Sequence, residues 1–327
     1  MMNIKLILPF LAILLFGALF NNVWGQKTTV PMDEAHWNVR SDDFKFQKYR
    51  GVPSLHLPQG QAELKDVEFQ NGIIEFDIAF PQTRGFPGVK FRVQDDTNYE
   101  ELYLRPHQSG NPDANQYTPV FNGLAGWQLY YGEGHAKAVK YNFDYNVQGW
   151  NHVKLIIHDT RGEVYINDME TPLFQIHELK HGSKKGPIAL KGGAKAVFAN
   201  FSYTPSTASL LKLKGQDLPK PDTGFITSWQ ISSPFEEAKL HGLTRLDDKS
   251  LKDLSWNKME TEFTGMLNVA RTAVRQGQKN TVLVKLTVDS DKSQVKKLDF
   301  GFSDKVLAYV NGDLVYGGSN IFGSRDY

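Results

Sequence analysis

The chain has 327 residues, with 37 Lys and Arg against 36 Asp and Glu, and it contains 0 Cys. Two domains are expected, because single hydrophobic cores stop growing beyond about 250–300 residues. The balanced charge argues against a nucleic-acid partner, and the lack of Cys excludes disulfides, thiolate zinc sites and cysteine nucleophiles. Aromatic residues make up 12%, a content that suits β-sheets and sugar-stacking surfaces.

Residues 1–25 predict a secretory signal peptide. Lys5 gives a positive start, an uncharged and mostly apolar run covers 6–20, and Val23 and Gly25 fit the positions that signal peptidase reads. The run is shorter than the roughly 20 residues that span a bilayer, which favours cleavage over an uncleaved membrane anchor. We therefore expect an exported protein, periplasmic or extracellular, without a membrane span after cleavage.

Residues 26–204 predict an all-β domain, because short alternating apolar and polar runs are broken by Gly, Pro, Asn and Asp. The clearest strands are 73–80, 89–94 and 99–105. We expect these three to be sheet neighbours that point their apolar side chains inward. Their other sides would form one solvated polar face, where Lys90 and Arg92 oppose Glu75 and Asp77.

Five further runs predict the remaining strands of this domain: 127–131, 150–159, 163–167, 186–191 and 197–203. Arg161-Gly162 predicts a tight turn between the second and the third of them. Residues 205–224 are rich in Pro, Ser and Thr and predict a linker.

Residues 225–327 predict a second, smaller β-sandwich. Its expected strands are 225–231, 281–288, 297–302 and 306–310, and Asn311-Gly312 gives a strong hairpin signal after the last. Short helices are expected within 236–254 and 266–275. Too few strands follow the hairpin to close a sandwich, so this domain is expected to be incomplete.

Four segments carry a family resemblance: Gly72-Ile73-Ile74-Glu75-Phe76-Asp77, Gly88-Val89-Lys90-Phe91-Arg92, Trp150-Asn151-His152-Val153-Lys154 and Val164-Tyr165-Ile166-Asn167. Together they resemble concanavalin A-like lectin/glucanase domains, above all the laminin-G-like and 3-keto-disaccharide-hydrolase-like branches. The resemblance implies a jelly-roll sandwich over roughly 40–204, a fold that hosts lectins, glycosidases, lyases and adhesion modules. In the tail, Ala308-Tyr309-Val310-Asn311-Gly312 is similar to galactose-binding-like jelly rolls.

Glu75 and Asp77 are candidate catalytic residues, because glycosidases work with two neighbouring carboxylates. The glucanases that the domain resembles carry a Glu-x-Asp-x-x-Glu pattern, but here Phe80 stands at the third position. A solvated strand face paired with Lys90 and Arg92 is therefore the favoured interpretation.

Residues 105–123 predict a long polar loop between two strands, and loops of this length tend to carry function. Its amide, Arg, His and Asp side chains suit sugar hydroxyls, and aromatic rings suit the apolar face of a pyranose. The candidate ligand-binding residues are Arg105, His107, Asp113, Gln116, Tyr117, Asn122 and Trp127. The alternative is an Ω-like loop whose amides satisfy its own turns.

Two members of this loop have further interpretations. His107 is a candidate catalytic residue, since an acid/base pair with Asp113 would titrate near neutral pH, although no spacing rule supports the pair. Arg105 suits a carboxylate or sulfate on an acidic sugar, or neutralisation of Glu101.

Asp95 and Asp96 are candidate calcium ligands, because they stand in a turn with Thr97 and Asn98. The turn lacks the spacing of an EF-hand, so a bare turn is favoured over a structural calcium site. No other cofactor is expected, since the sequence carries no nucleotide, α/β-hydrolase or zincin motif.

Three functions follow from these observations, with carbohydrate as the expected partner. The first is a carbohydrate-binding protein that uses the polar sheet face and the 105–123 loop. The second is a glycoside hydrolase or polysaccharide lyase built around the same loop. The third is a structural or adhesion module without a small ligand, and the sequence leaves open whether chemistry occurs.

Overall fold

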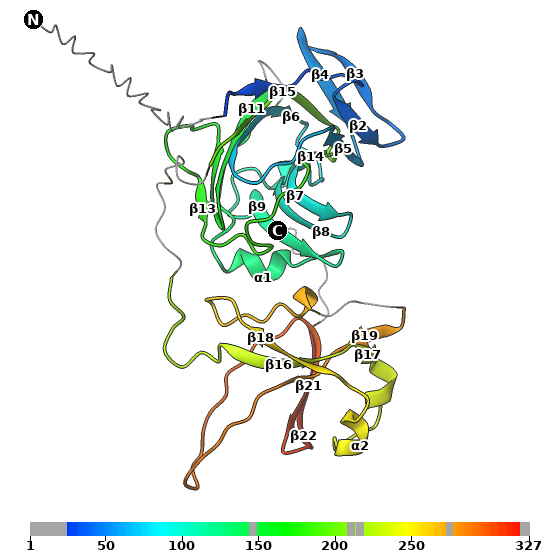
Figure 1. The fold of residues 1–327 in the computed structure, drawn as a ribbon, viewed down its shortest axis with the longest axis vertical. Coiled ribbons are helices and arrows are strands. Elements are labelled where there is room, and N and C mark those ends of the chain that lie inside the picture. The colour runs from blue at the N-terminus through cyan, green and yellow to red at the C-terminus, as the bar shows by residue number, and fades with distance from the viewer. Residues whose placement is uncertain (1–24, 144–148, 208–212, 214–218, 273–276, 321–327) are drawn as a thin grey trace, which may run out of the picture.

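The computed structural model describes residues 25–143, 149–207, 213, 219–272 and 277–320. Its first part is a sandwich of two antiparallel sheets, and a smaller β-rich part lies beyond the sandwich on the side of the short helix α1 (Figure 1). The predicted signal peptide lies outside the described residues, apart from Gly25. The all-β jelly-roll prediction for the first part is confirmed.

The eight-stranded sheet has the order β13-β12-β11-β6-β15-β4-β3, with β1 paired to β15. Its strands are β1 (Thr28–Thr29), β3 (Lys45–Tyr49), β4 (Val52–Leu57), β6 (Gly72–Ala79), β11 (Trp150–His158), β12 (Arg161–Ile166), β13 (Phe174–Ile176) and β15 (Ala196–Pro205).

The seven-stranded sheet has the order β10-β9-β8-β7-β14-β5-β2. Its strands are β2 (Trp37–Arg40), β5 (Gln61–Leu64), β7 (Gly88–Asp95), β8 (Asn98–Leu104), β9 (Asn115–Phe121), β10 (Leu124–Ala125) and β14 (Ala189–Lys191). A 3-10 turn, η1 (Pro106–Gln108), connects β8 to β9, and α1 (Trp127–Tyr131) follows β10.

The core lies between the two sheets and is apolar. On β6, Ile74, Phe76 and Ile78 are fully buried, and from the facing sheet Val89 and Leu102 join the same cluster. This is the alternation that the sequence shows, because successive side chains of a strand point to opposite faces. Burying one such side chain contributes roughly 1.5–3 kcal/mol to folding.

The smaller part consists of short sheets. β16 (Ser228–Ser232) pairs with β18 (Trp256–Glu260) and β20 (Val284–Lys285), β17 (Phe235–Glu236) with β19 (Lys279–Thr281), and β21 (Asp304–Val310) with β22 (Asp313–Asn320). Its helical turns are η3 (Glu237–Leu240), α2 (Asp248–Leu251) and η4 (Val269–Arg271). The hairpin predicted at Asn311-Gly312 is present, whereas the strand predicted at 297–302 is not. The boundaries of two domains and the likeness to galactose-binding domains stay predictions.

The expectation that the three clearest strands form one sheet is wrong. β6 belongs to the eight-stranded sheet, whereas β7 and β8 are neighbours in the seven-stranded one. Glu75 and Asp77 therefore do not face Lys90. Local alternation predicts which side of a strand is buried, but sheet partners are set by contacts far apart in sequence.

Arg92 is buried instead of solvated. It has a positive φ of 49°, and the pairing of β7 with β8 is irregular between Phe91 and Asp95. Its guanidinium donates to the backbone carbonyls of Gln70, Asp159 and Gly182 at 2.6–2.8 Å. These charge-assisted bonds offset the cost of removing the cation from water.

Three local predictions also need correction. Residues 127–131 form the helix α1 and not a strand, and the segment 105–123 contains the whole strand β9 and is therefore not one long loop. The tight turn between β11 and β12 is at Asp159-Thr160, because His158 pairs with Arg161.

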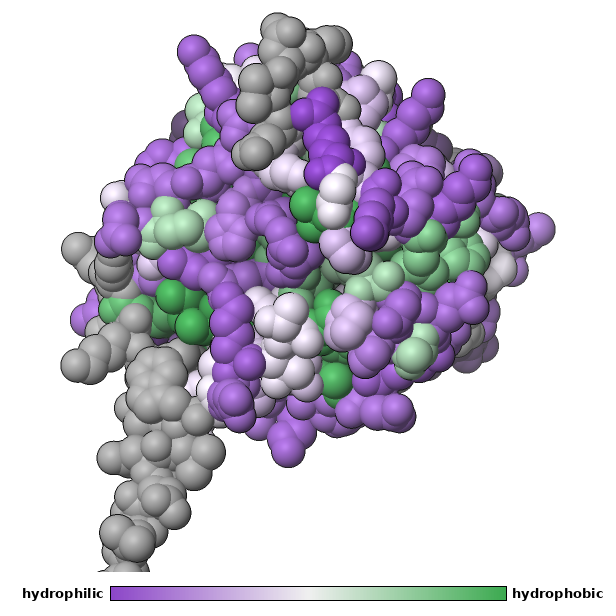
Figure 2. Space-filling model, turned by 90° about the horizontal axis from the view of Figure 1, so that it is seen from above, coloured by the Kyte–Doolittle hydropathy of each residue, from purple (hydrophilic) through white to green (hydrophobic). Residues whose placement is uncertain are grey.

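The face of the molecule seen in Figure 2 is mostly polar, and apolar residues of the described part are scattered over it in small areas. Within the described ranges, the helices are too short to cross a membrane.

Candidate functional site

The outer face of the seven-stranded sheet gathers polar and charged side chains. Glu101 and Tyr103 alternate along β8, and the register puts Lys90 of β7 opposite Glu101 and Gln116 of β9 opposite Tyr103. Lys191 of β14 lies in the same row as Tyr103, with Gly88 between them. We call Lys90, Glu101, Tyr103 and Lys191 the Glu101 cluster.

Glu101 is the centre of this cluster and is 2% exposed. Lys191 donates to its carboxylate through Nζ. Lys90 Nζ donates to Gln61 Oε1 at 2.8 Å and lies 4.1 Å from the centroid of the Tyr99 ring. The buried carboxylate thus pairs with the Lys191 ammonium, and Lys90 stands opposite it on the neighbouring strand.

Gly88 forms the floor between Lys191 and Tyr103. A Cβ at this position would lie 2.0 Å from the backbone oxygen of Leu102, so no other residue fits. The missing side chain lets β7 lie close against the backbone of β8 at this point.

Burial dominates the electrostatics of this face. It lowers the pKa of Lys90, a shift that Glu101 opposes and the charge of Lys191 reinforces. It also raises the pKa of Tyr99 to about 12 and that of Tyr103 still further. Both phenols therefore stay protonated near neutral pH, whereas Lys90 is a better proton acceptor than an exposed lysine.

A second group of side chains surrounds Phe86 at the end of the same face. Arg105 pairs with the carboxylate of Asp113, and its guanidinium carbon lies 5.7 Å from the centroid of the Phe86 ring. The His107 ring packs edge-on against Phe86 at 5.8 Å. Burial lowers the pKa of His107, and the charge of Arg105 acts in the same direction. The structure therefore pairs Asp113 with Arg105 and brings three of the predicted ligand-binding residues together.

Gln116 and Trp127 connect the Glu101 cluster to α1. Gln116 accepts a hydrogen bond from the Tyr103 hydroxyl at 3.1 Å and donates to the backbone oxygen of Trp127 at 2.5 Å. Trp127, at the start of α1, is half-buried. Gln116 is thus placed on the predicted face, but its amide is already engaged within the protein.

The structure does not bring Tyr117 and Asn122 together with the other predicted ligand-binding residues. Tyr117 points to the inner side of the sheet, is fully buried, and donates to Glu100 Oε2 at 2.7 Å, so it offers no ring face to a sugar. Asn122 donates through Nδ2 to the backbone oxygen of Ala270 at 2.7 Å and so contacts the smaller part of the chain. Tyr117 belongs to the strand 115–121 and not to an open loop, and Asn122 follows directly after that strand.

Glu75 and Asp77 lie on the outer face of the other sheet and hold His152 between them. His152 Nδ1 is 2.6 Å from Asp77 Oδ1, its Nε2 is 3.7 Å from Glu75 Oε1, and Lys27 Nζ is 2.8 Å from Glu75 Oε2. Hydrogen bonding to these carboxylates raises the pKa of His152 to about 9, and His152 and Lys27 lower that of Glu75 to about 2. The predicted charge-paired strand face is present, with His152 and Lys27 as partners in place of Lys90 and Arg92.

The predicted calcium ligands serve other contacts. Asp95 Oδ1 accepts bonds from the backbone and hydroxyl of Thr97 at 2.7 Å, and Asp96 forms a two-pronged ion pair with Arg40. In the part of the chain that the structure describes, no three His, Asp or Glu side chains gather as a metal site. Calcium binding at this turn stays a prediction.

A protein-family model fits the first part of the chain. It describes a 3-keto-alpha-glucoside-1,2-lyase-like domain and matches residues 22–203, which is more than half of the 327 residues. The chain belongs to this family. The lyase-like domain covers both sheets of the sandwich and all four members of the Glu101 cluster, and the predicted 3-keto-disaccharide-hydrolase-like resemblance is confirmed.

Solved structures with similar folds are distant in sequence. Carbohydrate-binding module CBM66 from Bacillus subtilis is 14% identical, with a TM-score of 0.33 and coverage of 56% of this chain and 94% of that one. A β-glucanase from Bacillus licheniformis is 14% identical, with a TM-score of 0.35 and coverage of 58% and 95%. A putative glycosyl hydrolase from Parabacteroides distasonis is 17% identical, with a TM-score of 0.34 and coverage of 53% and 89%. No curated protein sequence matches the chain.

Sequence reasoning missed the Glu101 cluster as a site. The alternation of 99–105 placed Glu101 and Tyr103 on the outer side of their strand, and Lys90 on that of its own. The missing information was Lys191, about 90 residues away in sequence, which comes next to Glu101 only when β14 joins the sheet.

Proposed function

We propose that the Glu101 cluster binds a glucoside that carries a ketone at C3, and that it eliminates the group attached to C1. The observation that carries the proposal is the buried Glu101 carboxylate, which pairs with Lys191, stands opposite Lys90 and shares its strand face with the Tyr103 phenol. Family membership supports the choice of substrate, because the family is described by the cleavage of 3-keto-α-glucosides.

The elimination needs a base for the proton on C2 and cations near the ketone oxygen. A ketone at C3 makes the hydrogen on C2 acidic, because the charge left on C2 delocalises onto the ketone oxygen. Glu101 accepts that proton, and Lys90 and Lys191 stabilise the enolate oxygen electrostatically. The electron pair then forms the C1–C2 double bond while the C1–O bond breaks.

The leaving oxygen also needs a proton. Tyr103 lies 5.6 Å from Lys191 Nζ, measured to its ring centroid, and burial keeps its hydroxyl protonated. We assign it the role of proton donor to the leaving alcohol. The products are then a conjugated enone and an alcohol, so protons and electrons balance without a cofactor.

A second candidate function is sugar binding without chemistry. It is favoured by the internal contacts of this face, since the Tyr103 hydroxyl already donates to Gln116 and Arg105 already pairs with Asp113. A binding surface tolerates such fixed groups, whereas a proton donor must exchange its partner during the reaction.

Product analysis separates the candidates. The full chain is incubated with methyl 3-keto-α-glucoside, and the ultraviolet absorbance of the enone and the proton NMR spectrum are followed. The proposal expects enone and methanol in equal amounts. Free 3-keto-glucose without enone would indicate a hydrolase, saturable binding without product would indicate a binding protein, and the absence of both would refute the assignment of this face.

We also propose that the protein is exported, to the periplasm or the outside of the cell. The support is the sequence pattern of residues 1–25, of which 1–24 lie outside the described residues. Mass spectrometry of the protein recovered from expressing cells tests this, and the proposal expects a mature chain that begins at Gln26.

A further inference from the structure

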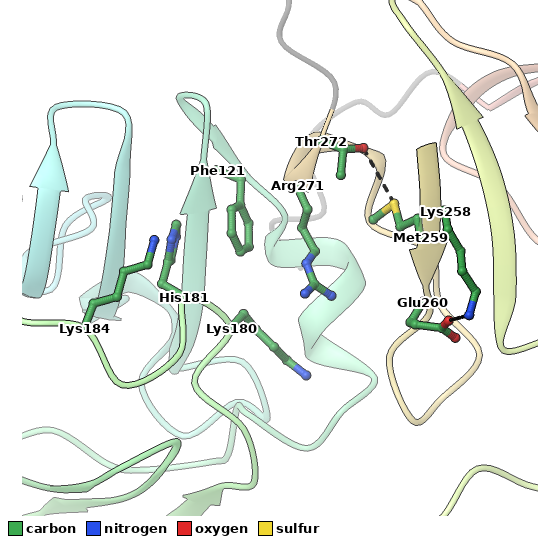
Figure 3. A pocket seen from close by; sticks show the side chains of 9 residues that line it. All are labelled: Phe121, Lys180, His181, Lys184, Lys258, Met259, Glu260, Arg271 and Thr272. Carbon is green, nitrogen blue, oxygen red and sulfur yellow. Dashed lines mark hydrogen bonds and ion pairs between the residues drawn. The ribbon is translucent and has the colours of Figure 1, made fainter. Parts of the chain in front are cut away.

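A cavity of about 360 Å³ lies where the sandwich meets the smaller part of the chain (Figure 3). Sites for small molecules commonly enclose about 300–1,000 Å³. The sandwich and the smaller part both contribute to its wall: Phe121, Lys180, His181, Lys184, Lys258, Met259, Glu260, Arg271 and Thr272. Four of these nine residues are Lys or Arg, and one is a carboxylate.

The aromatic wall of the cavity is already occupied. The Phe121 ring stacks on His181 with 4.0 Å between centroids, Arg271 lies 5.8 Å from its centroid, and Phe121 is only 8% exposed. A neutral pyranose is usually held by stacking on an open aromatic face, and this cavity offers none. Recognition here must rest on polar and charged groups.

Two of the cations are balanced by the protein itself. Lys180 Nζ lies 2.5 Å from Glu262, 3.0 Å from Glu178 and 3.2 Å from Glu133. At the mouth, Lys258 pairs with the exposed Glu260 at 2.5 Å. Neither lysine therefore brings unmatched charge to the cavity.

Arg271 and Lys184 are the cations that can serve a ligand. Arg271 donates one N–H to Glu262 Oε1 at 3.2 Å, and its side chain is 33% exposed. A guanidinium has five N–H donors, so others remain for a planar oxyanion. Lys184 is exposed and comes from the other side of the junction. His181 adds no charge at neutral pH, because burial lowers its pKa to about 4.

We infer that this cavity binds a sugar unit that bears a carboxylate, with Arg271 as the direct partner of the carboxylate and Lys184 as the second cation of the cavity wall. The sugar class rests on the proposed function, but the binding does not depend on chemistry at Glu101. The site needs both parts of the chain, since Lys184 belongs to the sandwich and Arg271 does not. The predicted acidic-sugar role of Arg105 is thus taken by Arg271, because Arg105 is buried and paired.

Calorimetry with a matched pair of probes tests the inference. Methyl α-glucuronide and methyl α-glucoside differ in the carboxylate at C6, and we expect the full chain to bind the first at least tenfold more tightly. Lys184→Ala should weaken glucuronide binding at least tenfold without loss of fold, since Lys184 is exposed. Lys185→Ala is the matched control, because the neighbouring Lys185 is exposed but does not line the cavity, and it should bind as the wild type does.

Three further measurements test whether the cavity recognises the charged sugar or any anion. Added salt should weaken glucuronide binding. Inorganic sulfate that binds as tightly as the glucuronide would mean an adventitious ion only, and equal binding of both sugars or no effect of Lys184→Ala would also overturn the inference. Glu101→Gln should keep the binding, so a failure of the proposed reaction leaves this test intact.

Discussion

The two parts of the chain are held together differently. The sandwich has a continuous core, whereas beyond residue 207 the described buried hydrophobic residues are Ile231, Phe235, Met259 and Ala270. Most of the large hydrophobic side chains that are exposed lie after residue 224, among them Val295, which is 97% exposed, and Val288, which is 74% exposed. The sandwich therefore carries its own stability, and the smaller part depends on what it contacts.

What it contacts is a buried polar network on the sandwich. Glu262 accepts from the Tyr130 hydroxyl at 3.1 Å, Asn268 donates to the same hydroxyl at 3.0 Å, and Thr264 donates to Glu133 at 3.3 Å. Such a network fixes geometry, because each buried polar group must keep its partner. The contact between the two parts, which also forms the cavity in Figure 3, is therefore stabilised by polar partners more than by apolar burial.

Separating the two parts gives the largest expected effect. A chain ending at Thr207 should still unfold cooperatively in denaturant, because it keeps both sheets and the core. A chain starting at Lys220 should show no cooperative transition, because few of its described apolar side chains are buried. Circular dichroism during denaturant titration measures both, and cooperative unfolding of the second fragment would break the comparison.

Removing the central cation of the junction should have the next largest effect. Lys180→Ala removes the cation that the buried Glu133 and Glu262 share, and breaking such a pair costs about 3–5 kcal/mol. The free energy of unfolding of the full chain is the measurement. Lys258→Ala is the control, since its pair with Glu260 is exposed and should leave stability unchanged. Equal effects of the two variants would contradict the account of the junction.

The charge pairs on the eight-stranded sheet should matter least. His152 has a folded-state pKa of about 9 against an ordinary 6.5, so its stabilisation is complete below pH 6.5 and is lost as the pH rises through 9. The His152 side chain is 37% exposed, so solvent screening limits the effect to about 1 kcal/mol or less. Stability of the wild type and of His152→Gln, measured between pH 6 and 10, should differ in slope. A wild type with no decline over that range would refute the assigned pairing.

Much of the sandwich could be predicted from the sequence, because its signals are local. The alternation of Ile74, Phe76 and Ile78 fixes the buried side of β6, and Asn311-Gly312 fixes a hairpin. Burial of polar residues could not be predicted in the same way. Arg92 and Tyr117 read as surface residues, and they are buried because carbonyls and a carboxylate from distant segments satisfy them.

In the candidate site, too, local groupings could be predicted and contacts between distant segments could not. Arg105, His107 and Asp113 are neighbours in sequence, and the structure brings them together at Phe86. The residues of the Glu101 cluster come from the three strands β7, β8 and β14, and Lys191 comes near Glu101 only because β14 pairs with β7. For α1, an aromatic run typical of a strand becomes a helix between Gly126 and Gly132, with Tyr130 buried against Glu262.

Turnover of methyl 3-keto-α-glucoside by Glu101→Gln tests the central claim most directly. Glu75→Gln is the matched control, because Glu75 also pairs with a lysine but lies on the opposite sheet. Loss of a general base typically lowers the rate by about 10²–10⁴-fold, so we expect a loss of at least 100-fold in Glu101→Gln and an unchanged rate in Glu75→Gln. An active Glu101→Gln variant, or an equal loss in Glu75→Gln, would contradict the assignment of the reaction to the Glu101 cluster.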